Sequence, residues 1–247
     1  MAKETLVVIP AYNEEMNIET VIVNLRNAGI EEYADVLVIN DGSADNTEEV
    51  VKKTGTKVLS QVYNMGYGAA LQTAYKYAQE REYKYIIQID ADGQHDVKNV
   101  DVIYEKMKAS EQTDRPLDII IGSRYLEGAK SFPMSGIRLF AVKMFRKIIK
   151  IVTKQTVTDP TSGLQGLSRR AFCYYAGYQK FDIRYPDINM LIQMMLLGYQ
   201  VEETPAIMYE RTMGEAMHSG IIKPMKYMCV MMLSTLIAIL RHKRIKG

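Results

Sequence analysis

Two carboxylates, Asp90 and Asp92, stand one residue apart directly after an apolar run at residues 85–89. At the end of a strand, both side chains can turn toward the same point. Two like charges this close are costly as a bare pair, so a divalent cation is their natural partner, with the phosphates of a ligand completing its oxygen shell. The pair predicts a cation and phosphate site, and a solvated turn is the alternative.

The apolar runs that must position such a site alternate with helical patterns. This order is typical of an α/β fold with a mostly parallel sheet and helices on both faces. Open sheets of this kind bind ligands beyond the carboxyl ends of their strands. The expected strands are 6–9, 36–40, 57–59, 85–90 and 117–121. Polar motifs directly follow four of them, at 10–15, 41–43, 90–92 and 122–125.

Composition limits the classes of protein. A chain of 247 residues that is 47% hydrophobic can bury a large core, and we expect one domain over 1–218 and an appendage over 219–247. The net charge of +2 does not suggest nucleic-acid binding. The two cysteines, Cys173 and Cys229, fit a reducing cytoplasm rather than a disulfide framework. The amino terminus carries no signal-peptide pattern, so we do not expect secretion.

A basic helix is expected at 137–152. Its helical projection places Lys143, Arg146, Lys147 and Lys150 on one face and most apolar residues on the other. Arg138 falls on the apolar side, where a charge must be paired in the core or aimed at an anion. Further on, we expect a helix at 187–198 and two short strands within 200–209, broken at Pro205.

The last segment is apolar from 227 to 240 except for Ser234 and Thr235. As a helix this stretch is about 21 Å long, too short for a hydrocarbon core of about 30 Å. Basic residues follow at 241–246 and suit an anionic membrane surface. We expect the segment to lie in the membrane interface, pack against a small membrane protein, or pair with another copy of the chain. A soluble core helix is the alternative.

Taken together, the motifs resemble the family 2 glycosyltransferases, and within them the polyprenyl-phosphate sugar synthases related to dolichol-phosphate mannose synthase. The resemblance covers roughly residues 5–218. It implies a GT-A fold, a Rossmann-like nucleotide-sugar domain, and a hexosyl- or N-acetylhexosaminyl-transferase. Its six elements lie at 8–15, 39–43, 64–70, 90–95, 121–125 and 159–163.

The resemblance assigns Asp90, Asp92 and Gln94 to a Mg or Mn ion, for which oxygen donors are suited. Tyr12 can cover a base face, and Glu14 and Asp41 can accept hydrogen bonds from base or ribose, or cap the helices that follow them. The nucleotide-binding set is Pro10, Ala11, Tyr12, Glu14, Asp41, Gly66, Gly68, Asp90 and Ala91. The two glycines open a helix whose N–H groups can approach a phosphate, although Tyr67 stands where the family often has a basic residue.

The resemblance also implies the groups that act on the acceptor and the leaving group. It assigns Arg124 and Arg138 to the phosphate of an acceptor lipid, and Arg211 to a loop that closes over the pyrophosphate. In this loop Ala216 replaces the usual serine. With Asp92 these arginines form the expected catalytic set. His95 and His218 are candidates for acid/base work or for binding a backbone or phosphate oxygen.

The implied reaction is metal-dependent, inverting transfer of a sugar from a nucleotide diphosphate to undecaprenyl or dolichyl phosphate at the cytoplasmic membrane face, for glycolipid or cell wall polysaccharide synthesis. A lipid monophosphate has a second pKa near ~6, so it arrives ionised and needs no protein base. One alternative is transfer to a saccharide hydroxyl, with Asp187 as the base. Another is a non-catalytic scaffold that binds a nucleotide sugar for a membrane partner.

Overall fold

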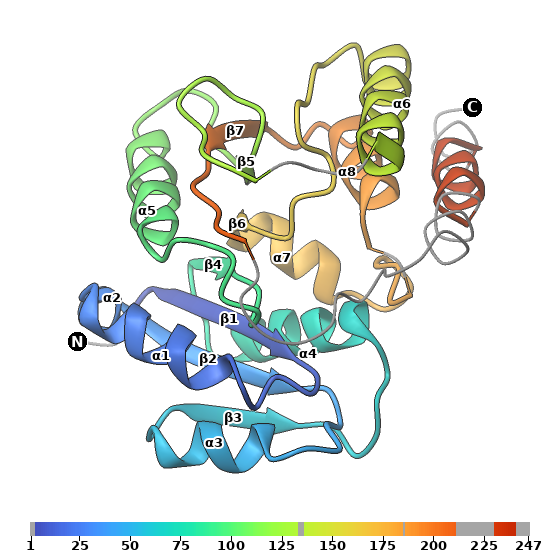
Figure 1. The fold of residues 1–247 in the computed structure, drawn as a ribbon. Coiled ribbons are helices and arrows are strands. Elements are labelled where there is room, and N and C mark those ends of the chain that lie inside the picture. The colour runs from blue at the N-terminus through green and yellow to red at the C-terminus, as the bar shows by residue number, and fades with distance from the viewer. Residues whose placement is uncertain (1–2, 133–135, 185, 211–229, 241–247) are drawn as a thin grey trace.

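The computed structural model describes residues 3–132, 136–184, 186–210 and 230–240, with the backbone alone for 137 and 138. The strands in these ranges are β1 (Thr5–Ala11), β2 (Ala34–Asn40), β3 (Lys57–Ser60), β4 (Tyr85–Gln88), β5 (Ile119–Ser123), β6 (Gln165–Ser168) and β7 (Val201–Pro205). They form one sheet in the order β3-β2-β1-β4-β6-β5-β7 (Figure 1). Only β6 is antiparallel to its neighbours, so the mostly parallel sheet is confirmed.

The expected strands are present with shifted ends. β4 ends at Gln88, two residues before the expected end, so Asp90 lies in the loop beyond the strand. β5 begins two residues later than expected and includes Ser123. No strand is predicted at β6, because its four residues, Gln-Gly-Leu-Ser, contain no apolar run. β6 is a strand because its backbone fills the gap between β4 and β5.

Helices cover both faces of the sheet, as the alternating pattern predicts. One face carries α1 (Ile18–Asn27), α2 (Ile30–Tyr33), α3 (Thr47–Lys53) and α5 (Lys98–Ser110). The other carries α4 (Tyr67–Glu80), α6 (Gly136–Thr153), α7 (Arg169–Ala176) and α8 (Ile188–Leu196). The strands serve both layers: Leu6 and Val8 point into one core cluster, and Val7 and Ile9 into the other. This is the period-two alternation of a sheet buried on both sides.

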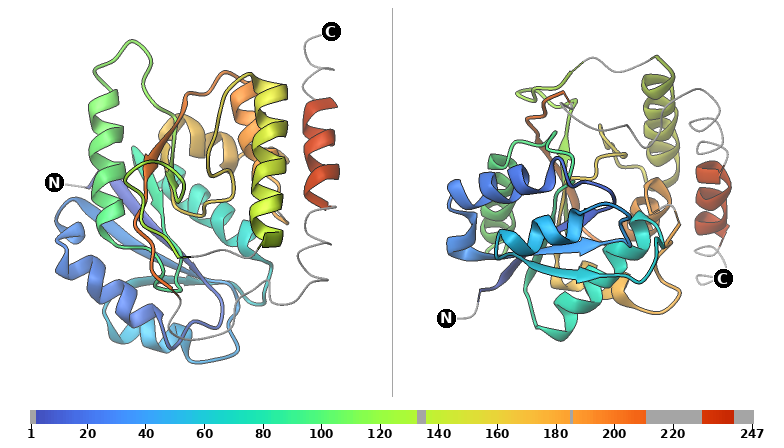
Figure 2. Two further views of the ribbon diagram at one scale, coloured as in Figure 1. Left: turned by 45° about the horizontal axis from the view of Figure 1, so that its top comes forward. Right: turned by 60° about the horizontal axis from the view of Figure 1, so that its bottom comes forward.

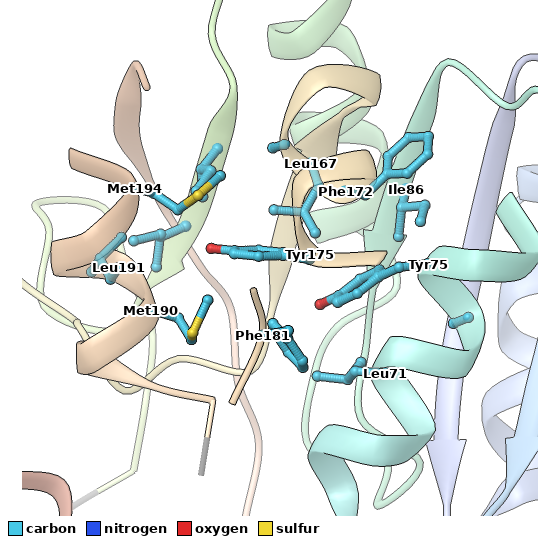
Figure 3. Close-up of a cluster of buried hydrophobic side chains, with 14 of the residues drawn as sticks. Leu71, Tyr75, Ile86, Leu167, Phe172, Tyr175, Phe181, Met190, Leu191 and Met194 are labelled. Carbon is cyan, nitrogen blue, oxygen red and sulfur yellow. The ribbon is translucent and has the colours of Figure 1, made fainter. Parts of the chain in front are cut away.

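The second layer is held by aromatic contacts between helices that are far apart in the sequence (Figure 3). The Tyr75 ring of α4 lies 5.5 Å from that of Tyr175 in α7 and 5.4 Å from that of Phe181, edge-on to the latter. The buried Tyr75 hydroxyl donates to Gln88 Oε1 at 2.8 Å. This bond satisfies a polar group that would otherwise be costly in the core.

Residues 230–240 form a helix beside α6 at the periphery of the molecule (Figure 2). Met231 is buried in the core, and the Ser234 hydroxyl donates to Asp182 Oδ2 at 2.9 Å and accepts from Asn189 at 2.7 Å. Five large apolar side chains of this helix are 44–60% exposed: Met232, Leu233, Leu236, Ile237 and Leu240. None of the helices in the described ranges is long and apolar enough to cross a bilayer. The expected boundary at 218 and 219 lies outside the described residues.

Candidate active site

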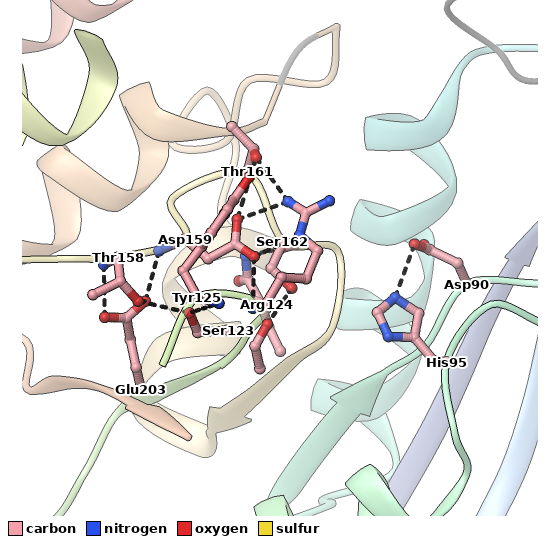
Figure 4. A network of polar contacts seen from close by, with 12 residues as sticks. Asp90, His95, Ser123, Arg124, Tyr125, Thr158, Asp159, Thr161, Ser162 and Glu203 are labelled. Carbon is pink, nitrogen blue, oxygen red and sulfur yellow. Dashed lines mark hydrogen bonds and ion pairs between the residues drawn. The ribbon is translucent and has the colours of Figure 1, made fainter. Parts of the chain in front are cut away.

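Asp90 stands at the carboxyl edge of the sheet, held by three neighbours. Its Oδ1 accepts from the Tyr67 hydroxyl at 3.3 Å, and its Oδ2 lies 3.5 Å from His95 Nε2 (Figure 4). A Cβ atom built on Gly163 would lie 2.7 Å from Oδ2. Burial works to raise the pKa of Asp90, but His95, the Tyr67 hydroxyl and the charge of Arg124 outweigh it and hold this pKa below its usual value. The site therefore favours an ionised, fixed carboxylate.

The loop beyond Asp90 brings two further oxygen donors. Asp92 Oδ1 accepts from the Gln94 N–H at 3.1 Å, and Gln94 Nε2 donates to the Tyr209 carbonyl at 3.3 Å. The Gln94 side-chain oxygen has no hydrogen-bond partner in the described part of the chain and could bind a ligand. In the described ranges no three His, Cys, Asp or Glu side chains group as a ready-made metal cage. Two carboxylates and an amide oxygen fit Mg or Mn in chemistry, with the remaining ligands to come from phosphate and water.

His95 lies beside Asp90. It is buried, and its Nδ1 has no hydrogen-bond partner among the described residues. Its Nε2 faces Asp90 rather than open solvent. This geometry fits a histidine that binds an oxygen atom better than one that transfers a proton to a ligand.

The loops after β1 and β2 are joined by reciprocal hydrogen bonds. The Asn13 N–H donates to Ser43 Oγ at 3.0 Å, and Asn13 Oδ1 accepts from the Ala44 N–H at 2.8 Å. Glu15 Oε2 accepts from both nitrogens of Asn46 at 2.9 Å. Of the expected nucleotide residues, Pro10 and Ala11 are buried at the end of β1, whereas Tyr12 is 44% exposed beside the joined loops. An exposed ring on a rigid base can stack on a nucleobase.

Asp41 holds the backbone between β3 and α4. Its Oδ1 and Oδ2 accept from the N–H groups of Met65 and Gly66, each at 2.8 Å, and the residue is 3% exposed. Burial raises the pKa of Asp41, an effect that these two hydrogen bonds oppose. The expected alternatives were a nucleotide contact and a cap on the helix that follows. The carboxylate holds the loop that enters α4 and does not cap α3, and Glu14 accepts from the Asn17 side chain at 2.7 Å. Contact of Asp41 and Glu14 with a nucleotide stays a prediction.

The two glycines before and within α4 have different roles. Gly66 adopts φ = +97°, a backbone conformation that side chains disfavour, and gives its N–H to Asp41. Gly68 is buried, and a Cβ there would lie 2.5 Å from the Ile183 carbonyl oxygen. Close packing therefore requires a glycine at this position, and the approach of its backbone to a phosphate stays a prediction. Tyr67, between them, reaches Asp90.

Arg124, expected at the acceptor phosphate, is bound on one edge by Asp159. Its Nε donates to Asp159 Oδ2 at 2.6 Å, and its Nη2 donates to Oδ1 at 2.7 Å and to Thr161 Oγ1 at 2.9 Å. The Asp159 side chain is fully buried and that of Arg124 is 13% exposed. Burial disfavours the charged arginine, but the bonds to Asp159 outweigh it and raise the pKa of Arg124. Among the described residues Nη1 makes no hydrogen bond, and this edge of the guanidinium is the one that a ligand could bind.

Arg146 differs from the three lysines that share its face of α6. Its guanidinium carbon lies 4.4 Å from the centre of the Tyr125 ring, and its Nε donates to the Thr158 carbonyl at 2.5 Å. A cation over an aromatic face is stabilised by the ring quadrupole. Lys143, Lys147 and Lys150 are exposed as expected. Tertiary packing against the segment before β6 draws this one arginine inward.

Several expected residues lie outside the described part of the structure. Arg211, Ala216 and His218 fall in residues 211–229, and for Arg138 only the backbone in α6 is described. Sequence reasoning also missed residues. The motif at 159–163 belongs to the resemblance, but no role is predicted for Asp159. Glu203 of β7 is not predicted either, and it accepts from the N–H groups of Thr158 and Asp159. A single glutamate in a short strand carries no signal in the sequence.

A sheet of this topology, with carboxylates beyond β4 and joined loops beyond β1 and β2, defines a nucleotide-sugar glycosyltransferase fold. A likeness to solved structures supports this assignment of the fold. Glucosyl-3-phosphoglycerate synthase from Mycobacterium tuberculosis, in complex with Mn2+, uridine diphosphate and phosphoglyceric acid, matches with a TM-score of 0.64 and 18% identity, over 98% of this chain and 78% of that one.

The model of Glycosyl transferase family 2 matches residues 6–175, and the chain belongs to this family. A dolichyl-phosphate beta-glucosyltransferase from Trichomonas vaginalis is 30% identical over 89% of this chain and 68% of its own length. A polyprenol monophosphomannose synthase from Mycolicibacterium smegmatis is 25% identical over 88% and 82%. An uncharacterized protein from Methanocaldococcus jannaschii is 32% identical over 82% and 80%. The resemblance deduced from the motifs is confirmed.

Proposed function

We propose that this chain transfers a sugar from a nucleotide diphosphate to the phosphate of a polyprenyl lipid. The observation that carries the proposal is a fixed arginine at one end of a segment whose other end packs against Asp90. Asp159 binds Arg124 through two hydrogen bonds, and Gly163 of the same segment lies against the Asp90 carboxylate. We expect the acceptor phosphate to bind at the Nη1 edge of Arg124, next to the site of the donor sugar. The names of the Trichomonas and Mycolicibacterium relatives support the same acceptor class.

The chemistry asks for alignment rather than for a base. A phosphate monoester has a second pKa near ~6, so one oxygen is an available nucleophile at neutral pH. Arg124 binds and orients this anion for in-line attack at the sugar carbon, and the bond to the nucleotide diphosphate breaks with inversion. The departing diphosphate needs positive charge, which we expect Arg211 to supply.

A divalent cation would complete the donor site. Asp90, Asp92 and Gln94 would hold Mg or Mn, and the ion would supply positive charge to offset that of the pyrophosphate. Solved relatives in fold were crystallised with Mn2+, and the oxygen donors of this chain fit the same kind of ion. Tyr12 would lie over the base, and the joined loops after β1 and β2 would hold the nucleoside.

The acceptor's tail requires a membrane, and we place the enzyme at the cytoplasmic face as a peripheral protein. The exposed apolar side chains of helix 230–240 and the exposed lysines of neighbouring α6 suit the interface of an anionic leaflet. The basic residues at 241–246 extend the positive charge. A small membrane protein or a second copy of the chain is the competing partner for this surface.

Release of the nucleotide diphosphate tests the proposal. UDP and GDP sugars are incubated with the protein and Mn2+, with and without farnesyl phosphate as a short polyprenyl phosphate. We expect release that requires both the lipid phosphate and Mn2+, with Asp92→Asn inactive but folded. Release with a saccharide acceptor instead, abolished by Asp187→Asn, would favour a hydroxyl acceptor. Donor binding without any release would favour a scaffold.

A further inference from the structure

Glu203 of β7 makes three hydrogen bonds to one dipeptide (Figure 4). Its Oε2 accepts from the Thr158 N–H at 2.7 Å. Its Oε1 accepts from the Asp159 N–H at 2.8 Å and from the Thr158 hydroxyl at 2.9 Å. Hydrogen bonds to an ionised acceptor are stronger than those between neutral groups, so this carboxylate fixes the backbone at Asp159.

Asp159 in turn fixes the orientation of the Arg124 guanidinium. Both of its oxygens accept from the guanidinium, and Oδ2 also accepts from the Arg124 N–H at 3.0 Å. Because the Asp159 side chain is fully buried, its carboxylate cannot turn without moving the arginine. Glu203 thus lies two steps from the guanidinium, and its effect on Arg124 passes through the backbone of Asp159.

A second set of bonds keeps the dipeptide from moving independently. The Thr158 hydroxyl lies 2.6 Å from Ser123 Oγ, which accepts the Tyr125 N–H at 3.2 Å. Residues 123–125 and 158–159 are therefore tied together on both sides of Arg124. Such a network holds a single arrangement when every member is satisfied.

We propose that Glu203 is a positioning residue for the acceptor phosphate, acting through Asp159 to set the place of the Arg124 guanidinium. The identity of the phosphate rests on the proposed function. The chain of contacts from Glu203 to Arg124 does not. Glu203 itself touches neither substrate nor cation.

The variant Glu203→Gln keeps the size and shape of the side chain. It places an NH2 group against N–H donors of the dipeptide, so at least one bond is lost and Asp159 shifts. With farnesyl phosphate as acceptor, we expect kcat/KM for the acceptor to fall about tenfold, the loss typical of a charge-assisted hydrogen bond. The affinities for Mn2+ and for the nucleotide sugar stay unchanged, since Asp90 and Asp92 are not in this network.

Glu202→Gln is the matched control. Glu202 is the neighbour of Glu203 on β7, is half exposed, and pairs with Lys106 at 3.0 Å. It makes no contact with the dipeptide among the described residues, so we expect wild-type kinetics. A purely structural effect of removing charge from β7 appears in both variants.

A double-mutant cycle tests the route of the effect. Arg124→Lys lacks the paired donors that bind Asp159, so Glu203→Gln in this background is expected to cause no further loss. Full additivity of the two losses overturns the route through Arg124, because residues that act as a unit are not additive.

The Nε–Hε resonance of Arg124 in 15N-labelled full-length protein gives a readout that needs no turnover. We expect slow proton exchange in the wild type and in Glu202→Gln, and faster exchange in Glu203→Gln. Wild-type acceptor kinetics in Glu203→Gln overturn the proposal whatever the resonance does. When the wild type transfers nothing to farnesyl phosphate, the proposed function fails, and the Arg124 resonance alone decides whether Glu203 positions the arginine.

Discussion

Gly163 lies against Asp90 so closely that an added Cβ would be 2.7 Å from Oδ2 and 3.0 Å from Oδ1. Gly163 ends the segment whose first residue, Asp159, binds Arg124. The segment 159–163 thus touches the donor-side carboxylate at one end and the acceptor-side arginine at the other. Its length sets the separation of the two halves of the site.

The variant Gly163→Ala is expected to weaken the affinity for Mn2+ about tenfold, because displacing a ligand's support typically costs this much. The methyl group must push the Asp90 carboxylate away from the orientation that Tyr67 and His95 give it. Titration with Mn2+, followed by electron paramagnetic resonance, measures the change. Gly136→Ala, where a Cβ meets nothing within 4 Å, is the control. Equal Mn2+ affinity in both variants would contradict the role of this contact.

Replacing Arg124 with Lys is expected to raise the acceptor KM or lower kcat, with donor affinity nearly unchanged. Lysine keeps the charge but cannot make the paired bonds to Asp159. The melting temperature should also fall, because a fully buried carboxylate loses its paired hydrogen bonds.

Asp187→Asn is expected to have a mild effect in the same acceptor assay. An inactive Asp187→Asn variant that folds and binds donor would point to a hydroxyl acceptor.

Asp41 gives the protein a pH dependence of defined sign. Because the folded state raises its pKa, the native protein binds this proton more tightly than the unfolded chain does. The contribution of Asp41 to the free energy of unfolding is therefore complete below the unfolded pKa of about 3.9 and is lost as the pH rises through the folded value. Urea unfolding of the wild type and of Asp41→Asn across this range measures it. A difference between them that grows in favour of the wild type with rising pH contradicts the expectation.

Helix 230–240 can be tested without removing it. Truncation would expose the core at Met231 and break the bonds of Ser234 to Asp182 and Asn189, so point substitutions separate folding from binding. Leu233→Gln with Leu236→Gln should leave the melting temperature unchanged, since both side chains are more than half exposed. Each leucine buried in lipid contributes about 1.5–3 kcal/mol, so binding to anionic vesicles should fall at least tenfold. Vesicle sedimentation that matches the wild type would exclude this face as the membrane contact.

The donor half of the fold follows from the sequence, because buried parallel strands are continuous apolar runs and the polar motifs stand at their ends. Asp90 and Asp92 were found in this way. The acceptor half was harder to predict. β6 has no apolar run, and Arg146 leaves its exposed helix face for the Tyr125 ring. Glu203 acts through backbone hydrogen bonds that no pattern in the sequence marks. These features depend on tertiary contacts between residues that are 12 to 83 positions apart in the sequence.

The fixed antiparallel pairing of β6 limits how far the length of the segment before it can change during evolution. Loops that leave the parallel strands end in helices and can lengthen without moving the residues before them. The segment 159–163 instead leads into β6, whose pairing of Gln165 with Gln88 is fixed, and the Gly163 carbonyl is itself bound by Gln88 at 2.9 Å. One inserted or deleted residue between Asp159 and Gln165 would shift Asp159 relative to this fixed pairing and so displace the Arg124 side chain that it binds. Viable descendants of this chain are therefore expected to keep the length of this segment.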